Sequence, residues 1–204
     1  MYKDGLKREL DFLLSLVGII LLSPIFLLLC LLIKLDSKGP VIFKQKRVGK
    51  NKSYFNIYKF RTMKIDTPKE IPTHLLSNPD FYITRVGKFL RKTSLDELPQ
   101  LFNILKGDMA IIGPRPALWN QYDLIEERDK YKANDIRPGL TGLAQISGRD
   151  ELEIEDKSKL DGEYTAHITF WMDVKCFVLT FVSVFKSDGV VEGGTGAVKK
   201  EDDK

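Results

Sequence analysis

The stretch FLLSLVGIILLSPIFLLLCLLI, residues 12–33, contains no charged residue over 22 positions. As a straight helix it would measure roughly 33 Å, close to the thickness of the hydrocarbon core of a bilayer. Its 17 Leu, Ile, Phe and Val residues together favour membrane insertion by roughly 5 to 10 kcal/mol. The stretch is too long, and the sequence after it too poor in small residues, for a signal peptide. It therefore predicts a helix inserted in a membrane.

Ser23 and Pro24 lie at the middle of this apolar stretch. Proline removes a backbone hydrogen bond and clashes with the preceding turn, so we expect a marked bend there. Basic residues flank both ends of the stretch, namely Lys3, Lys7 and Arg8 on one side and Lys34, Lys38, Lys44, Lys46 and Arg47 on the other. Because such charges stay in the cytoplasm, residues 1–36 predict a re-entrant helix that enters and leaves one leaflet. A straight span with a tolerated proline is the alternative.

The remainder of the 204-residue chain is soluble in character and long enough for one globular domain. We predict a mostly helical α/β fold, with a compact domain over residues 37–188 and a flexible tail over residues 189–204. The net charge of +4 comes without a basic run interleaved with aromatic residues and without zinc-finger spacing, which argues against nucleic-acid binding. Combined with the apolar stretch, this charge favours an anionic membrane surface.

Cysteine and histidine are scarce, with 2 residues of each. Cys30 lies inside the apolar stretch and Cys176 in an expected helix, so both are interpreted as reduced packing residues. His74 and His167 are far apart in the sequence and lack a third partner. Metal sites built from thiolates or imidazoles are thereby disfavoured, and any metal would be an oxygen-ligated cation such as Mg²⁺.

Residues 41–48 and 55–63 have the composition of strands, and the turn-forming residues 49–52 between them predict a small hairpin. In the second strand, alternation places Lys59 and Arg61 on the same face. Two cations that project together can hold a phosphate, or they can solvate the edge of a sheet. The residues alone leave both interpretations open.

Residues 94–103, SLDELPQLFN, place the adjacent carboxylates of Asp96 and Glu97 at the start of an expected helix. Arg91 lies just upstream, so the stretch is typical of a site for a phosphate and a cation. A structural interpretation competes with this one, because Ser94 and Glu97 match a capping box and acids are favoured in a first helical turn. From this stretch alone, capping is the better-supported interpretation.

The region after these carboxylates predicts a helix and a short strand that lead to a stiff loop. Pro99 suggests that the helix begins a few residues after Ser94, and Gly107 predicts its end. Residues 109–112 form the strand, and Arg115 follows between two prolines. Flanking prolines hold an arginine extended, which suits bidentate contact with a phosphate. An ordinary proline-rich connection is the alternative.

Residues 117–134 predict an exposed amphipathic helix, in which the side chains available for burial are Trp119, Tyr122, Leu124 and Ile125. Residues 137–149 then form a glycine-rich segment that contains Gln145 and has Arg137 and Arg149 at its ends. Glycines permit a close approach of backbone to a ligand. Paired with Arg115 and the two carboxylates, this segment predicts an anion-binding cleft.

Two more helices are expected before the tail. Residues 151–167 place Asp161 and Tyr164 on one face, three positions apart. Residues 170–185 are rich in large aromatic side chains: Phe170, Trp171, Phe177, Phe181 and Phe185. We interpret the second helix as an interfacial amphipathic helix lying on lipid, with burial in the core as an equal alternative.

These motifs resemble the bacterial sugar transferase family, the monotopic phosphoglycosyl transferases. The matching blocks occur in order at residues 59–63, 94–109, 112–116 and 137–149, together with Ser23-Pro24 and with Asp161 and Tyr164. The match spans nearly the whole chain and fails only over residues 64–82 and the tail. Several long blocks in the right order make a specific signal. The chain is similar to a small member, the catalytic unit without the extra N-terminal membrane domain of larger members.

The resemblance implies a catalytic domain at the cytoplasmic face of the bacterial inner membrane. It implies transfer of a sugar phosphate from a UDP-sugar to undecaprenyl phosphate with release of UMP, in the assembly of capsule, exopolysaccharide or glycoprotein glycans. Asp96 would be the nucleophile that forms a covalent phosphosugar intermediate and would ligate a required Mg²⁺, with Glu97 as the adjacent acid. Arg115 would bind the nucleotide. An acetamido sugar is the expected donor group.

The chemistry fits these residue types, because a carboxylate can attack phosphorus to give an acyl phosphate once cations offset the pyrophosphate charge. The residues expected to bind substrate are Lys59, Arg61, Arg91, Arg115, Arg137, Gln145, Arg149, Asp161 and Tyr164. Two other classes remain open: a membrane-bound Mg²⁺-dependent nucleotide-sugar hydrolase or phosphatase, and a non-catalytic membrane scaffold. The oligomeric state, a homodimer included, is also open.

Overall fold

The computed structural model describes residues 2–67, 79–148 and 152–186. These residues form the predicted mostly helical α/β structure, with two small sheets. The helices are α1 (Lys7–Asp36), α2 (Pro79–Tyr82), α3 (Arg85–Lys92), α4 (Gln100–Lys106), α5 (Tyr122–Asp129), α6 (Leu143–Ser147), α7 (Ile154–Ala166) and α8 (Phe170–Lys186). The strands are β1 (Ile42–Val48), β2 (Tyr54–Phe60), β3 (Ala110–Ile112) and β4 (Gly139–Thr141). The tail expected over residues 189–204 lies outside the described residues.

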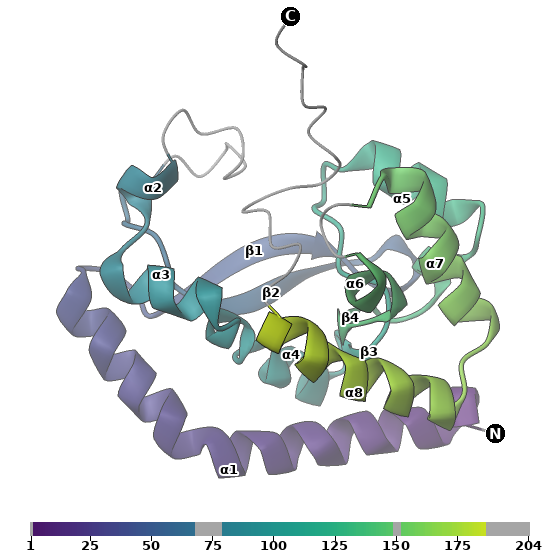
Figure 1. Cartoon of the computed structure of the whole chain (residues 1–204), viewed down its shortest axis with the longest axis horizontal. Coiled ribbons are helices and arrows are strands. Elements are labelled where there is room, and N and C mark those ends of the chain that lie inside the picture. The colour runs from purple at the N-terminus through teal and green to yellow at the C-terminus, as the bar shows by residue number, and fades with distance from the viewer. Residues whose placement is uncertain (1, 68–78, 149–151, 187–204) are drawn as a thin grey trace, which may run out of the picture.

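α1 is one continuous helix with Pro24 inside it. Figure 1 shows that α1 bends partway along its length, as expected, and that its two limbs follow the outline of the domain. The hydroxyl of Ser23 donates to the carbonyl oxygen of Ile20 at 2.8 Å, in the turn before the proline. Among the described residues, α1 is the helix whose length and composition suit a membrane span. The bend follows from the N–H that Pro24 lacks.

The two limbs of α1 pack on different parts of the domain. In the first limb, Asp11 accepts a hydrogen bond from the backbone N–H of Ile111 in β3 at 3.1 Å. The second limb is buried in an apolar cluster formed by Leu29, Ile33, Phe60 and Leu90. The outward side chains of α1 are exposed: Leu13, Leu14, Val17, Ile20, Leu21, Leu27, Leu28, Leu31 and Leu35. α1 therefore belongs to the core of the domain on one side and presents apolar surface on the other.

β1 and β2 form the expected antiparallel hairpin, with Arg47 opposite Phe55. The fully buried Asn103 of α4 occupies the other edge of β2. Its amide nitrogen donates to the carbonyl oxygen of Asn56 at 2.8 Å, and its side-chain oxygen accepts from the N–H of Tyr58 at 2.9 Å. These bonds satisfy strand groups that β1 does not reach. They fix α4, and with it the turn that precedes α4, beside the hairpin.

β3 and β4 pair in parallel, with Ala110 opposite Gly139. The glycines of this region are needed for close backbone packing. A Cβ on Gly139 would collide with the backbone nitrogen of Gly113, and a Cβ on Gly142 would collide with the carbonyl oxygen of Gly113. The glycine-rich segment thus packs closely against the backbone at Gly113, next to the loop that carries Arg115.

The helix expected over residues 117–134 is shorter than predicted, because α5 begins only at Tyr122. The side chain of Gln121 accepts a hydrogen bond from the N–H of Leu118 at 2.7 Å, which stabilises a turn where the helix was expected to run. Trp119 and Tyr122 are 40% and 61% exposed. The prediction that these two aromatic side chains are available for burial is wrong.

α8 is amphipathic, and its start lies near the start of α1 (Figure 1). The ammonium group of Lys7 in α1 forms an ion pair with Asp173 of α8 at 2.6 Å. One face of α8 is buried and includes Cys176, which is a free thiol as predicted. The opposite face is exposed and apolar, with Phe170, Trp171, Phe177, Val178, Phe181 and Val182. α1 and α8 therefore both present apolar side chains outside the core.

Candidate active site

The two carboxylates lie in a tight turn between α3 and α4. Ser94 has a left-handed backbone with φ 56° and ψ 15°, and Leu95–Glu97 forms a single 3-10 turn. The capping-box interpretation of Ser94 is wrong, since its side chain caps no helix end in the described part of the chain. α4 begins after Pro99 and ends at Gly107, as expected. A non-glycine residue in this conformation costs on the order of 1–3 kcal/mol, and such strain gathers at functional sites.

Two cations converge on Glu97. The ammonium nitrogen of Lys59 lies 2.7 Å from Glu97 Oε1, and the guanidinium nitrogen Nη2 of Arg115 lies 2.9 Å from the same oxygen. Asp96 Oδ2 is 3.8 Å from the Lys59 ammonium. The structure thus brings together Lys59, Arg115 and the carboxylate pair from three separate stretches of the predicted site.

The pKa values of the two neighbouring carboxylates are shifted in opposite directions. Burial acts to raise the pKa of Glu97, but the charges of Arg115 and Lys59 outweigh it and hold that pKa well below its usual range. For Asp96, burial dominates and raises the pKa, with Lys59 lowering it less and the adjacent charge of Glu97 raising it further. Glu97 is therefore a fixed anion that holds two cations. Asp96 has the less engaged carboxylate oxygens of the pair.

The loop that carries Arg115 is held by its own backbone carbonyl groups. Pro114 O accepts from the N–H of Gly139 at 2.8 Å, and Arg115 O accepts from Nη1 of Arg128 at 2.9 Å. Pro116 O accepts from Nη1 of Arg47 at 3.0 Å. Successive carbonyl groups of the loop are thus satisfied by hydrogen bonds from three distant segments, so the Arg115 guanidinium is presented from a stiff support.

Arg128 and Arg47 hold this loop, and the sequence interpretation assigned neither to the site. Arg128 is 3% exposed, and its Nε and Nη2 donate to Asp161 Oδ2 at 2.8 and 2.6 Å. Arg47 lies on the hairpin face that also carries Lys59. Burial, with the charge of Arg115, lowers the pKa of Arg47 to about 10. The alternation of side chains along β1 could have placed Arg47 on the same face as Lys59. No local sequence pattern indicates a role for Arg128 at the site.

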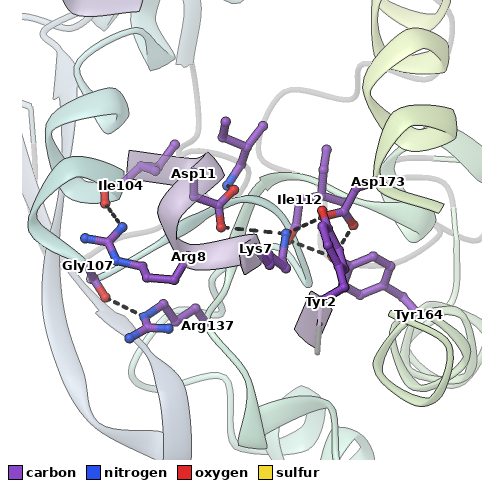
Figure 2. A network of polar contacts seen from close by, with 11 residues as sticks. Tyr2, Lys7, Arg8, Asp11, Ile104, Gly107, Ile112, Arg137, Tyr164 and Asp173 are labelled. Carbon is purple, nitrogen blue, oxygen red and sulfur yellow. Dashed lines mark hydrogen bonds and ion pairs between the residues drawn. The ribbon is translucent and has the colours of Figure 1, made fainter. Parts of the chain in front are cut away.

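Several predicted substrate-binding residues lie elsewhere, with partners inside the protein. Arg61 donates to the carbonyl oxygen of Ser37 at 2.7 Å, beyond the end of α1. Asp161 is buried against Arg128. The hydroxyl of Tyr164 lies 2.6 Å from Asp173, as Figure 2 shows. The structure thus gives these three side chains packing partners, and Asp161 reaches the site only through Arg128.

Of the other predicted residues, one lies near the carboxylate pair and the others lie elsewhere in the protein or outside its described part. Arg91 donates to the hydroxyl of Thr62 at 3.0 Å, and its charge contributes to lowering the pKa of Asp96. Gln145 has a buried amide beside Gly142. Arg137 donates to the carbonyl oxygen of Gly107 at the far end of α4 (Figure 2). Arg149 lies outside the described residues.

Comparison with known proteins identifies the family. The model of the bacterial sugar transferase family matches residues 2–187. The chain belongs to this family. It is 41% identical over 184 residues to the undecaprenyl-phosphate glucose phosphotransferase of Komagataeibacter xylinus, covering 85% of this chain and 35% of that protein. It is 38% identical over 201 residues to an Aeromonas hydrophila protein named UDP-N-acetylgalactosamine-undecaprenyl-phosphate N-acetylgalactosaminephosphotransferase, covering 94% of this chain and 45% of that protein.

A relative of matching length also belongs to this family. The uncharacterized sugar transferase EpsL of Bacillus subtilis is 37% identical over 185 residues, which cover 91% of this chain and 90% of that protein. In contrast, the chain spans less than half the length of the Komagataeibacter and Aeromonas proteins. The similarity to these longer proteins is therefore confined to the part of each that this chain matches.

Proposed function

We propose that this chain transfers a sugar 1-phosphate from a UDP-sugar to undecaprenyl phosphate through a covalent intermediate on Asp96. The observation that carries the proposal is the geometry at the carboxylate pair. Glu97 holds Lys59 and Arg115 within 2.7 and 2.9 Å, so two cations stand beside Asp96, whose own oxygens are less engaged. This arrangement favours approach of a pyrophosphate to Asp96 rather than to Glu97.

In the first step, a carboxylate oxygen of Asp96 attacks the phosphorus atom that carries the sugar. The bond from this phosphorus to the bridging oxygen of the diphosphate breaks, and UMP leaves with that oxygen. In the second step, a phosphate oxygen of the lipid attacks the same phosphorus and the acyl-phosphate bond to Asp96 breaks. One difficult transfer is thereby split into two easier ones, and the product is a lipid diphosphate sugar.

Mg²⁺ is part of the proposal, and the donor set is compatible with it. Among the described residues, no group of three or more metal-binding side chains occurs. Mg²⁺ is commonly bound through one or two carboxylates together with substrate phosphates and water. Asp96 would hold the ion together with the diphosphate, where it would offset negative charge. The carboxylate of Glu97 is already paired with Lys59 and Arg115.

The placement of the site suits a lipid acceptor. Leu95 and Leu98, which flank the carboxylate pair, pack against the cluster that contains Leu29 and Ile33 of α1. The turn that carries the pair therefore packs against the same apolar cluster as the second limb of α1. We propose that α1 is re-entrant and that α8 lies at the interface, on the cytoplasmic face of the bacterial inner membrane. This placement holds Asp96 at the depth where the phosphate of a polyprenyl phosphate lies.

The donor is tested by intact mass spectrometry of the purified protein with Mg²⁺ and a panel of UDP-sugars, without lipid acceptor. The panel contains glucose, galactose and acetamido sugars, with an acetamido sugar as the proposed donor. We expect a mass increase of one sugar phosphate that maps to Asp96. Release of UMP and free sugar phosphate without an adduct would instead support a hydrolase. Absence of both products with every donor would contradict the proposal and favour a scaffold.

In Glu97→Gln, we expect the acid limb of the pH profile for UMP release to move to lower pH. The protonated form of Asp96 cannot attack phosphorus, so activity falls as the pH drops through its raised pKa. The substitution removes the like charge of Glu97 and leaves Lys59 facing Asp96 alone, and both changes lower that pKa. Glu163→Gln, an exposed substitution on α7, is the control. A limb that stays in place or moves to higher pH contradicts the assignment.

A further inference from the structure

Two arginines from distant parts of the chain meet at the C-terminal end of α4. Arg8 of α1 donates to the carbonyl oxygens of Ile104 and Leu105 at 2.6 and 2.9 Å. Arg137 donates through Nε to the carbonyl oxygen of Gly107 at 2.9 Å. Figure 2 shows the two guanidinium groups close together on the same helix end. They bind carbonyl groups at the end of the helix, where the carbonyl oxygen of Ile104 also accepts from the N–H of Gly107 at 3.0 Å.

Helix capping uses only part of what these side chains offer. A guanidinium group has five N–H donors, of which Arg8 uses two and Arg137 one in these bonds. Within residues 2–67, 79–148 and 152–186, neither arginine forms an ion pair with a carboxylate. Two adjacent positive charges with free donors and no paired carboxylate are suited to an external anion with several oxygens.

An open hollow of about 390 Å³ lies on α1 beside Arg8 and is lined by Arg8, Glu9, Phe12 and Leu13. Its wall changes from charged to apolar within little more than one helical turn of α1. Arg8 also lies 5.8 Å from the centre of the Phe12 ring, which keeps the guanidinium beside the apolar wall. From Leu13 the surface continues into the exposed apolar side chains of α1. A ligand that fits has a negative head and an apolar tail.

We propose that Arg8 and Arg137 bind the phosphate of an anionic membrane phospholipid, with an acyl chain lying on Phe12 and Leu13. Glu9 lines the hollow, and Asp11, which also interacts with the charge of Arg8, is paired with Lys7 at 3.7 Å and accepts from the N–H of Ile111. The guanidinium groups of Arg8 and Arg137 therefore favour a headgroup with a net negative charge. The site goes beyond the transferase reaction and gives Arg137 a ligand of its own. A bound lipid fixes the start of α1 and the end of α4 at one depth in the bilayer.

This phosphate site is separate from the site proposed for the acceptor lipid. Glu97 and Gly107 are joined by a short turn and α4, so at 1.5 Å per residue they stand roughly 15 Å apart. A phosphate held by Arg8 and Arg137 therefore cannot lie against Asp96 at the same time. The occupant is a resident lipid, and the acceptor lipid reaches the carboxylate pair at the other end of α4.

The test is native mass spectrometry of the detergent-purified full chain titrated with phosphatidylglycerol, and separately with phosphatidylcholine. We expect one phosphatidylglycerol to bind, with at least roughly tenfold preference over phosphatidylcholine, because two guanidinium groups with free donors face the headgroup. Arg137→Gln and Arg8→Gln are each expected to weaken the binding of phosphatidylglycerol by roughly tenfold, while Arg137→Lys retains most of that binding. Lys159→Gln, at a lysine of α7 that is 51% exposed, removes the same charge elsewhere and serves as the control.

Equal binding of both lipids, or unchanged binding in Arg137→Gln, would overturn the proposal. One-for-one displacement of phosphatidylglycerol by undecaprenyl phosphate would also overturn it, because the site would then belong to the acceptor. If Arg8→Gln unfolds because α4 loses its cap, the comparison of Arg137→Gln with Arg137→Lys decides. The lipid-binding measurement needs neither a UDP-sugar nor catalytic turnover, so a failure of the transferase proposal would not affect its result.

Discussion

Asp96→Asn is expected to abolish the covalent adduct and to reduce lipid-linked product by roughly 10⁴-fold or more, as expected for loss of a nucleophile. The amide is isosteric with the carboxylate but cannot attack phosphorus. Because the folded protein raises the pKa of Asp96, the ionised side chain opposes folding at neutral pH, and its removal relieves that cost. We therefore expect the thermal unfolding midpoint to stay constant or rise while activity is lost.

Asp123→Asn is the matched control, because Asp123 is exposed on α5 and its side-chain oxygen accepts from the N–H of Leu124, a bond that asparagine retains. The adduct is read by intact mass and the product by transfer to undecaprenyl phosphate. Retained adduct in Asp96→Asn would rule out this residue as the nucleophile. If the variant instead lost about 1 kcal/mol of stability and nothing else changed, the carboxylate would be a helix cap.

Arg128→Gln is expected to destabilise the protein by about 3–5 kcal/mol, because it leaves the charge of Asp161 buried without a partner. Arg128 and Asp161 have side chains only 3% and 1% exposed, and their charged atoms lie 2.6 Å apart. For a chain of this size, the loss corresponds to a fall of roughly 10 °C in the thermal unfolding midpoint. The variant also loses the hydrogen bond to Arg115 O, so we expect the KM for the donor to rise.

A double substitution separates stability from positioning. Replacing both Arg128 and Asp161 by leucine removes both buried charges together, and such exchanges are often neutral or stabilising. We expect the unfolding midpoint to recover while the KM for the UDP-sugar stays high, since nothing then holds the carbonyl group of Arg115. Lys52 and Asp129 form an ion pair with side chains 55% and 41% exposed, and its removal is the control. Recovery of both properties would show that Arg128 acts through stability alone.

Much of the fold could be predicted because its signals are local. The 22 uncharged positions with a central proline predict a bent apolar helix, and the strand-like composition on both sides of residues 49–52 predicts the hairpin. Gly107, whose φ is 93°, ends α4 where expected, since a helix commonly ends at a left-handed glycine. Lys59 and Arg115 could be assigned to the carboxylate pair because a stiff loop and a strand face restrict where their side chains lie.

The partners of other assigned residues could not be predicted, because a polar side chain does not reveal its partner. The resemblance places Asp161 and Tyr164 among the substrate-binding residues, and in the structure their partners are Arg128 and Asp173, both buried. Arg128 lies 33 positions before Asp161 in the chain, which no helical or strand period connects. The capping box failed for a different reason, since a left-handed Ser94 directs the chain away from the helical start that the motif requires.

The packing of α1 means that the apolar helix cannot be treated as a detachable anchor. Asp11 fills the open edge of β3, Arg8 closes the end of α4, and Leu29 supplies part of a core cluster. A soluble version that starts after Asp36 would lack the α1 side of its core. The edge of β3, the end of α4 and the apolar cluster around Leu29 would then be exposed. Extraction from the membrane and folding are therefore a single problem for this protein, and detergents or nanodiscs must be chosen to preserve both.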